Sequence, residues 1–309
     1  MRVLPTPQQL RYLLTLAETQ HVGRAAQHCA VTQSTLSAGI IQLERLLDAR
    51  ILDRTAGKNV VFTALGHELV RHARTAMASL EAIADVADAA RAPLGGPLRL
   101  GVIPTIGPFL LPRLLPALRQ SFPQLRLLLR EELTARLTDW LAEARIDAAL
   151  LALPCACGDA ATVPVGRDEF LAALPEGHPL AARARVPATA LARERLLLLE
   201  DGHCLRDQAL AVCGQHGIAQ AGASEDYAAT SLHMLVQMVA SGLGVTLLPR
   251  LAVEGGICAG LGVKLRPLAG AGAWRTIGLA WRPNAPRAEE YRALVPLVQA
   301  ACAARGGLG

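Results

Sequence analysis

The sequence is poor in aromatic side chains, which make up 3% of its 309 residues, although 52% of the residues are hydrophobic. The interior must therefore be built from leucine, alanine and valine, which fits an α/β protein of two or three domains. No uninterrupted apolar run reaches the roughly 18 residues that indicate a membrane-spanning helix. The opening residues also lack the long apolar stretch of a signal peptide. We expect a cytoplasmic protein with no membrane partner.

Cysteines are few, and their number, seven, is odd. Without a secretion signal such a set does not indicate a structural disulfide framework, so each thiol is expected to be reduced. Cys29, Cys258 and Cys302 have apolar neighbours and are expected to be small core residues. Cys155 and Cys157 lie in a short loop with Pro and Gly, where metal binding or an additional redox pair stays open.

Positive charge is concentrated at the N-terminal end. Residues 1–74 carry nine Lys and Arg against five Asp and Glu, whereas residues 75–309 carry 22 against 21. A polyanionic partner would therefore meet the first quarter of the chain.

Three short helices are predicted in that basic region. Apolar residues recur at helical spacing over 8–19, over 22–29 and, after Thr32 as a good N-cap, from residue 33 to residue 47. Their proportions are typical of a helix-turn-helix, whose last helix enters the major groove of DNA with its N-terminal residues forward. The residues predicted to face DNA there are Gln33, Ser34, Thr35 and Ser37.

A hairpin and a long helix follow. Residues 51–54 and 60–63 read as the two arms of a wing, in which Arg54 and Lys58 are placed to neutralise phosphates. Apolar residues then recur every three or four positions up to residue 87, and we expect this helix to pair with its copy in a second subunit. The alternative is a helix that packs on its own wing. The predicted division is a DNA-binding domain over 1–63, a dimerisation helix over 64–92 and a hinge over 93–97.

Residues 98–309 are predicted to form a regulatory domain of two α/β lobes. Strands over 98–103, 125–130 and 148–153 alternate with helices over 109–121 and 134–144, which predicts a largely parallel sheet. Shorter strands and helices between 170 and 248 indicate a second, smaller lobe. Ligands of such folds bind between the lobes.

Five motifs in the predicted DNA-binding domain carry a family resemblance. They read Leu10-Arg11-Tyr12, Arg24-Ala25-Ala26, Val31-Thr32-Gln33-Ser34-Thr35-Leu36-Ser37, Gln42-Leu43-Glu44 and Asp53-Arg54-Thr55. The chain resembles the LysR-type transcriptional regulators over nearly its full length. This implies an α/β protein with a winged helix-turn-helix, a long linker helix and a two-lobed, Rossmann-like regulatory domain similar to periplasmic binding proteins. The implied partners are double-stranded promoter DNA, RNA polymerase and copies of the same chain in a homodimer or homotetramer.

Three further stretches, at residues 103–108, 199–209 and 275–279, resemble the peroxide-responsive members of that family. The resemblance implies that hydrogen peroxide is the signal, that Cys204 reacts with it and that Cys213 is the resolving cysteine. It also implies no cofactor and no metal, and a peroxide pocket formed by Thr105, Thr134, His203, Asp207 and Arg275.

The implied chemistry has a physical basis. A thiolate attacks peroxide, and a helix N-terminus with cationic neighbours favours a thiolate. If residues 204–213 are helical, the two Cα atoms lie roughly 13 Å apart, because each residue adds about 1.5 Å. A disulfide needs less than about 7 Å. Oxidation is therefore expected to unwind this segment and to change how the regulatory domains pack.

Other functions remain open at this point. His203, Cys204, Cys213 and His216 contain the donor atoms of a zinc site, although neither pair has finger spacing. Cys204 near His203 also permits a thiol peroxidase or a cysteine hydrolase. A regulator of the same family that binds a metabolite between its lobes is the closer alternative.

The predicted recognition helix departs from its relatives at four positions. Many of them carry Pro, Arg, Gln and Arg where this chain has Ser34, Ala38, Gly39 and Ile41. An interior glycine costs a helix about 1 kcal/mol relative to alanine. We therefore expect DNA shape to supply much of the specificity.

Overall fold

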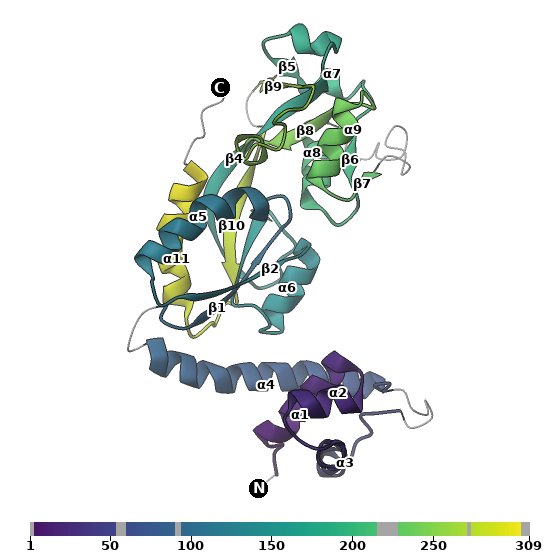
Figure 1. Cartoon of the computed structure of the whole chain (residues 1–309), viewed down its shortest axis with the longest axis vertical. Coiled ribbons are helices and arrows are strands. Elements are labelled where there is room, and N and C mark those ends of the chain that lie inside the picture. The colour runs from purple at the N-terminus through teal and green to yellow at the C-terminus, as the bar shows by residue number, and fades with distance from the viewer. Residues whose placement is uncertain (1–2, 54–59, 90–93, 215–227, 271–272, 304–309) are drawn as a thin grey trace. The chain divides into compact units, whose positions relative to one another are not determined.

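The computed structural model describes residues 3–53, 60–89, 94–214, 228–270 and 273–303 (Figure 1). The chain divides into two compact units. The N-terminal unit is Met1–Asp88 with the segment Glu143–Arg145, and the C-terminal unit comprises Ala89–Ala142 and Ile146–Gly309. Among the described residues, none of the helices has both the length and the hydropathy required to span a bilayer.

The N-terminal unit contains helices α1 (Pro7–Thr19), α2 (Val22–His28), α3 (Gln33–Leu47) and α4 (Ala64–Ala89). The sequence sets the start of α1 through a capping box, in which Thr6 and Gln9 satisfy each other's backbone N–H groups. The three predicted short helices are confirmed. Aliphatic residues and one aromatic residue form their shared core: Tyr12, Leu13, Leu16, Ala25, Ala26, Leu36, Ile40, Leu43, Ile51, Val70 and Ala73.

The two arms of the predicted wing are paired. An antiparallel bridge joins Leu52 to Phe62, and the Asp53 amide donates to the Val61 carbonyl over 2.8 Å. The tip of the wing, with Arg54 and Lys58, lies outside the described residues.

Helix α4 contributes to the N-terminal core and also exposes apolar side chains. Val70 and Ala73, in its first half, are 5% and 4% exposed and pack within that core. Leu65, Leu80 and Ile83 are 46%, 42% and 69% exposed. The helix thus packs on its own domain near its start and leaves an apolar stripe uncovered in the single chain.

The C-terminal unit is built on a sheet of eight strands, in the order β2-β1-β3-β10-β4-β9-β5, with β8 paired to β4 (Figure 1). A separate two-stranded sheet joins β6 and β7. The strand bounds are β1 (Pro97–Val102), β2 (Arg126–Glu131), β3 (Ala148–Leu153), β4 (Ala161–Pro175), β5 (Val186–Pro187), β6 (Leu198–Leu199), β7 (Ala228–Ala229), β8 (Thr246–Pro249), β9 (Val263–Ala269) and β10 (Trp274–Trp281).

The prediction of a largely parallel sheet is wrong. Strand β1 runs parallel to β2 and β3, as the alternating pattern indicates, but β10 runs antiparallel to β3 and β4. The reason is the 15-residue strand β4, whose first half pairs with β10 and whose second half pairs with β8 and β9. Strands from late in the chain thus complete the first lobe, and β4 connects the two lobes.

Helices cover this sheet, and the hydrophobic core is one continuous cluster through both lobes. Helix α11 packs against α5 and β4. The helix bounds are α5 (Gly107–Ser121), α6 (Thr134–Ala142), α7 (Ala188–Leu191), α8 (Cys204–Val212), α9 (Leu232–Ala240), α10 (Arg250–Glu254) and α11 (Ala288–Ala303), with a 3-10 turn at Pro179–Ala182.

Candidate functional site

The N-terminal turn of α3 presents the predicted DNA-facing residues. Thr32 caps the helix, and its hydroxyl accepts the Thr35 amide over 3.2 Å. Gln33, Ser34 and Thr35 are exposed, whereas Ser37 is half-buried. The Ser34 and Thr35 hydroxyls lie 2.9 Å and 2.8 Å from the Thr32 hydroxyl, so the cap holds two of these exposed polar side chains at the N-terminal end of the helix.

Gly39, which appears in the sequence only as a cost to α3, has a packing role. A Cβ atom placed there would lie 2.6 Å from Cδ2 and 2.8 Å from Cε2 of Tyr12. No real Cβ contact is that short. The absent side chain lets α3 lie directly on the Tyr12 ring of α1, and that contact fixes the helix against its core.

Glu44 joins α3 to the wing. Its Oε1 accepts the Ile51 amide over 2.8 Å and the Leu52 amide over 3.2 Å, at the start of the first wing arm. The helix and the wing are therefore held as one surface.

Cys204 is the first residue of α8, and it meets the first residue of α6. The Thr134 hydroxyl lies 3.0 Å from the Cys204 sulfur, and either atom can donate the proton. Thr134 is 8% exposed and comes from the first lobe, whereas Cys204 comes from the second. The predicted pair of Cys204 and Thr134 is thus brought together across the junction of the lobes.

His203 occupies the N-cap position of α8 without donating or accepting a side-chain cap bond. Burial lowers the pKa of His203 from its ordinary value of 6.5, and the nearby Glu200 opposes the shift. Burial therefore favours the neutral imidazole, which offers the site a hydrogen-bonding group rather than a charge.

Arg206 fixes the turn that precedes α8. Its Nε lies 2.8 Å from Asp201 Oδ1, and its Nη1 donates to the Leu199 carbonyl over 3.1 Å. Gly202 in that turn has a φ of +92°, which a side chain rarely permits. The positive charge of Arg206 is therefore held against Asp201 beside the site.

A buried network holds Thr105 and Arg275. The guanidinium of Arg275 donates to Thr105 Oγ1 and to the Thr105 carbonyl, both over 2.8 Å, and to Asp168 Oδ2 over 2.9 Å. Asp168 also accepts the Leu251 amide over 2.9 Å. The side chains of Arg275 and Asp168 are 0% and 3% exposed, so this ion pair is fully enclosed. The network ties β10, β4 and α10 to the loop after β1.

The remaining predicted residue, Asp207, lies exposed in the first turn of α8. Sequence reasoning missed two other residues. Asp168 holds Arg275 in place, and the side-chain oxygen of Gln208 is buried without a hydrogen-bond partner among the described residues. Gln208 follows Cys204 by four residues, which puts both on one face of α8. The four-residue spacing in the sequence therefore indicates that the Gln208 amide lies on the same face of α8 as Cys204.

Cys213 ends α8 and is buried, with 3% of its surface exposed. Burial raises the pKa of its thiol to about 11. Because α8 is helical from Cys204 to Val212, the Cα atoms of the two cysteines are separated by roughly 13 Å, at about 1.5 Å per residue. Both thiols are free in this structure.

The expectation that every thiol is reduced is wrong for one pair. Cys155 and Cys157 form a disulfide, with Cα atoms 5.2 Å apart, because the loop after β3 places them side by side. Among the described residues, no three or more His, Cys, Asp or Glu side chains are grouped to hold a metal ion. His216, one member of the alternative zinc set, lies outside them.

Comparisons with protein families match both units. Residues 7–67 match the bacterial regulatory helix-turn-helix protein model of the lysR family, and residues 91–303 match the LysR substrate binding domain. Among curated proteins, the chain is 42% identical to the DNA-binding transcriptional dual regulator OxyR of Escherichia coli K12, with 94% of each chain covered. It is 40% identical to a probable hydrogen peroxide-inducible genes activator of Mycobacterium avium, over 95% of this chain and 93% of that one.

Solved structures give the same result. A full-length OxyR from Pseudomonas aeruginosa, with a cysteine replaced by aspartate, aligns with a TM-score of 0.78 and 36% identity over 96% of this chain and 98% of that one. A hydrogen peroxide-bound cysteine-to-serine mutant of OxyR from Corynebacterium glutamicum aligns with a TM-score of 0.66 and 32% identity, covering 97% and 94% of the two chains. The chain therefore belongs to the LysR family of bacterial helix-turn-helix regulators, where its sequence and fold group it with the OxyR proteins.

Proposed function

We propose that this chain is a DNA-binding transcription regulator that hydrogen peroxide switches through Cys204. The observation that carries the proposal is the 3.0 Å contact between the Cys204 sulfur and the Thr134 hydroxyl at the junction of the lobes. It places a reactive atom at a helix N-terminus, next to a buried hydroxyl from the opposite lobe. The similarity to curated hydrogen peroxide-inducible activators supports peroxide as the oxidant.

The first step is oxidation of one sulfur. The Cys204 thiolate attacks one peroxide oxygen, the O–O bond breaks, and the other oxygen leaves as hydroxide, which takes up a proton to become water. Sulfur is left as a sulfenic acid. We assign the peroxide pocket to Thr105, Thr134, His203, Asp207 and Arg275, and we add the buried amide of Gln208. Thr134 orients the oxygens at the sulfur, and the neutral His203 exchanges a hydrogen bond with them.

In this pocket Arg275 acts through Thr105. Its guanidinium is bonded to both the hydroxyl and the carbonyl of Thr105, and Asp168 holds it from the other side. A Thr105 hydroxyl that accepts from Arg275 keeps its own proton for a second acceptor. Thr105 is thereby set as a donor to a peroxide oxygen or to the departing hydroxide.

The second step forms a disulfide and requires a conformational change in α8. Cys213 attacks the Cys204 sulfenic acid, a disulfide forms, and water leaves. With α8 intact the two Cα atoms are roughly 13 Å apart, beyond the limit of about 7 Å for a disulfide. Helix α8 must therefore unwind, and the buried Cys213 must leave the core, before the bond can close.

The response is delivered to DNA by the N-terminal unit. We assign Gln33, Ser34, Thr35 and Ser37 at the start of α3 to the major groove, and the exposure of the first three supports this assignment. Arg54 and Lys58, at the wing tip outside the described residues, are assigned to phosphates. The exposed Ala38 and Ile41 offer apolar contact, which suits thymine methyl groups.

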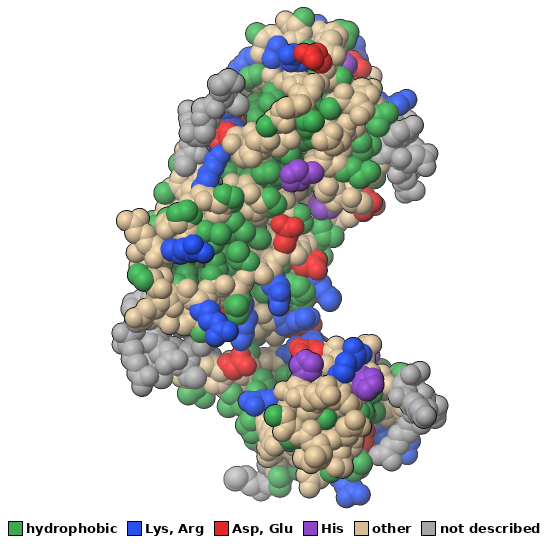
Figure 2. Space-filling model, viewed as in Figure 1, with side chains coloured by type: hydrophobic (Ala, Val, Ile, Leu, Met, Phe, Trp, Pro, Cys, Tyr) green, Lys and Arg blue, Asp and Glu red, His purple; other side chains and the backbone are tan. Residues whose placement is uncertain are grey.

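We propose that a second copy of the chain packs against the exposed apolar surfaces. Besides the stripe on α4, a groove of about 360 Å³ lies between α5 and the edge strand β2, lined by residues such as Leu111, Leu115 and Leu129. Figure 2 shows apolar side chains spread over the face of the C-terminal unit where α5 lies. An uncovered apolar edge strand invites pairing. We propose a homodimer or homotetramer that works in the cytoplasm with RNA polymerase as a regulator and not as an enzyme.

The test combines peroxide treatment with DNA footprinting. Reduced full-length protein is treated with a small excess of hydrogen peroxide and footprinted on a candidate promoter, as wild type, Cys204→Ser and Cys213→Ser, with Cys258→Ser as the matched control. The footprint should change in wild type and in the control and stay fixed in the other two. A footprint that still responds in Cys204→Ser overturns the proposal and favours a regulator of a bound metabolite. Repeated peroxide turnover by protein lacking residues 1–90 favours an enzyme instead.

A further inference from the structure

The short loop that follows β3 carries a second pair of cysteines outside the site described above. Cys155 and Cys157 are joined by a disulfide within the segment between Leu153, where β3 ends, and Ala161, where β4 begins. Their Cα atoms are 5.2 Å apart, within the range that a disulfide accepts without moving the backbone.

This disulfide is a poor structural crosslink. The entropy that a crosslink removes from the unfolded chain grows with the length of the loop it closes, and here only one residue separates the two cysteines. Both partners belong to one loop, so the bond joins no separate elements of the fold. A role in holding the structure together therefore does not account for the pair.

The same pair is open to reagents from solvent. Cys155 and Cys157 are half-buried at the edge of the core, whereas Cys213 is buried. A pocket of about 690 Å³ opens beside the loop, and of the two cysteines only Cys157 lines it. A small molecule in this pocket therefore meets Cys157 before Cys155.

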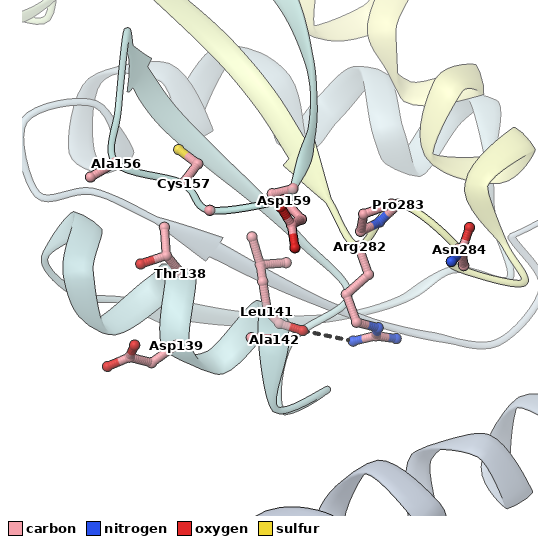
Figure 3. A pocket seen from close by; sticks show the side chains of 12 residues that line it. Thr138, Asp139, Leu141, Ala142, Ala156, Cys157, Asp159, Arg282, Pro283 and Asn284 are labelled. Carbon is pink, nitrogen blue, oxygen red and sulfur yellow. Dashed lines mark hydrogen bonds between the residues drawn. The ribbon is translucent and has the colours of Figure 1, made fainter.

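Charged and polar groups face that pocket. Asp139 and Thr138 come from α6, Asp159 comes from the cysteine loop, and Arg282 with Asn284 follows β10. In Figure 3, Cys157 lies at one wall and Arg282 with Asn284 at the opposite one, with the Asp159 carboxylate between them. Arg282 is held there, because its Nη1 donates to the Leu141 carbonyl over 3.1 Å. The cation of Arg282 and the carboxylate of Asp159 suit a small molecule that carries both carboxylate and ammonium groups.

We propose that Cys155 and Cys157 are a second thiol–disulfide couple, which small zwitterionic thiols reduce by attack on Cys157 from this pocket. The thiolate of the small molecule bonds to the Cys157 sulfur, the S–S bond breaks, and its electron pair leaves on Cys155, which takes up a proton. A second thiol then attacks the sulfur of the bound one. It releases a small disulfide, and Cys157 takes up a proton. In sum, two thiols give two electrons and two protons to the protein, and the oxidised small disulfide reverses the sequence.

Glutathione is the probe for this couple. Full-length protein is equilibrated with mixtures of reduced and oxidised glutathione, free thiols are alkylated, and trypsin cuts after Arg145 and Arg167. The resulting peptide contains Cys155 and Cys157 and no other cysteine. It should pass from two alkyl groups to none in one transition as the oxidised form increases, since the two sulfurs share one bond. A peptide that keeps two alkyl groups throughout, or that carries one glutathione and one alkyl group, overturns the proposal.

Paired variants test the side of attack. In Cys155→Ser, Cys157 has no partner and should retain bound glutathione, and it should form this mixed disulfide roughly tenfold faster than Cys155 does in Cys157→Ser. Equal rates in the two variants overturn the assignment of Cys157. Because the serines replace half-buried loop residues, near-UV circular dichroism establishes that both variants are folded.

The couple stands apart from the proposed peroxide switch. In Cys204→Ser and in the control Cys258→Ser, the transition of the 146–167 peptide should occur at the same glutathione ratio as in wild type. A transition that disappears in Cys204→Ser alone shows that the pair depends on Cys204 and refutes its independence. Failure of the peroxide footprint leaves this titration unaffected, so the two proposals fail separately.

Discussion

Removing the carboxylate of Asp168 should cost the C-terminal unit much of its stability. Asp168 is the buried partner of Arg275 and also accepts the Leu251 amide. Breaking a buried ion pair from one side costs about 3–5 kcal/mol, because the other charge stays buried without compensation. The orphaned Leu251 amide adds about 1–3 kcal/mol. For Asp168→Ala the expected loss is therefore about 4–8 kcal/mol, against a typical total of about 5–15 kcal/mol.

Tryptophan fluorescence in urea measures this loss in the unit concerned. The three tryptophans, Trp140, Trp274 and Trp281, all belong to the C-terminal unit, so their emission reports its unfolding alone. The matched control is Glu169→Ala. Glu169 adjoins Asp168, but its ion pair with Arg250 is on the surface, with 59% of the carboxylate side chain exposed. That variant should lose at most about 1 kcal/mol.

Two results would show that the buried ion pair of Asp168 does not stabilise the C-terminal unit in this way. A loss below about 1 kcal/mol in Asp168→Ala would mean that the Arg275 charge is not desolvated in the way the burial indicates. The double variant Asp168→Leu with Arg275→Leu should be more stable than Asp168→Leu alone, since no charge is then left buried. A double variant that is less stable than the single one would point to Thr105, and not the ion pair, as the partner that matters.

Three further predictions concern single side chains. In Gly39→Ala, the helix gains about 1 kcal/mol, but the new methyl group clashes with the Tyr12 ring, which costs about 1–3 kcal/mol. Calorimetry should therefore show a lower Tm for the N-terminal unit. A higher Tm would contradict the packing role of Gly39. Because the folded pKa of His203 is lowered below 6.5, the unfolded state binds the proton first as the pH falls. The urea concentration at the midpoint of unfolding should therefore decrease as the pH is lowered below 6.5, and it should decrease less in His203→Asn. If the midpoint changes equally with pH in both proteins, His203 is not the cause. Burial raises the pKa of the Cys213 thiol to about 11, so its alkylation in the reduced protein should become about tenfold faster for each pH unit between 7 and 10. An alkylation rate that does not change with pH in this range would contradict the raised pKa.

The helix-turn-helix could be predicted closely from the sequence because its signals are local. Thr6 and Thr32 cap their helices through bonds to residues three positions away, and the apolar spacing of each helix is regular. Strand β4 could not be predicted in the same way. Its two halves pair with different strands in different lobes, and the sequence pattern predicts only the second half, from residue 170, as a strand.

The same distinction holds for the candidate site. A resemblance names Cys204 and Thr134, but only the fold joins them, since 70 residues separate them in the chain. Asp168 is 107 residues from Arg275, and no local pattern indicates that pairing. Gly39 counts as a defect in a helix considered alone, and it becomes a requirement once Tyr12 of another helix is seen against it.

Oxidation of Cys204 is proposed to unwind α8, and hydrogen exchange on the full-length protein measures this change at the helix itself. Amides of residues 204–213 are compared in the reduced protein and after peroxide treatment, with disulfides mapped by mass spectrometry in the same samples and α9 as the internal reference. We expect a Cys204–Cys213 linkage together with loss of protection in α8, while α9 stays protected. A linkage that forms with the α8 amides still protected, or peroxide treatment that yields no such linkage, would contradict the proposed unwinding.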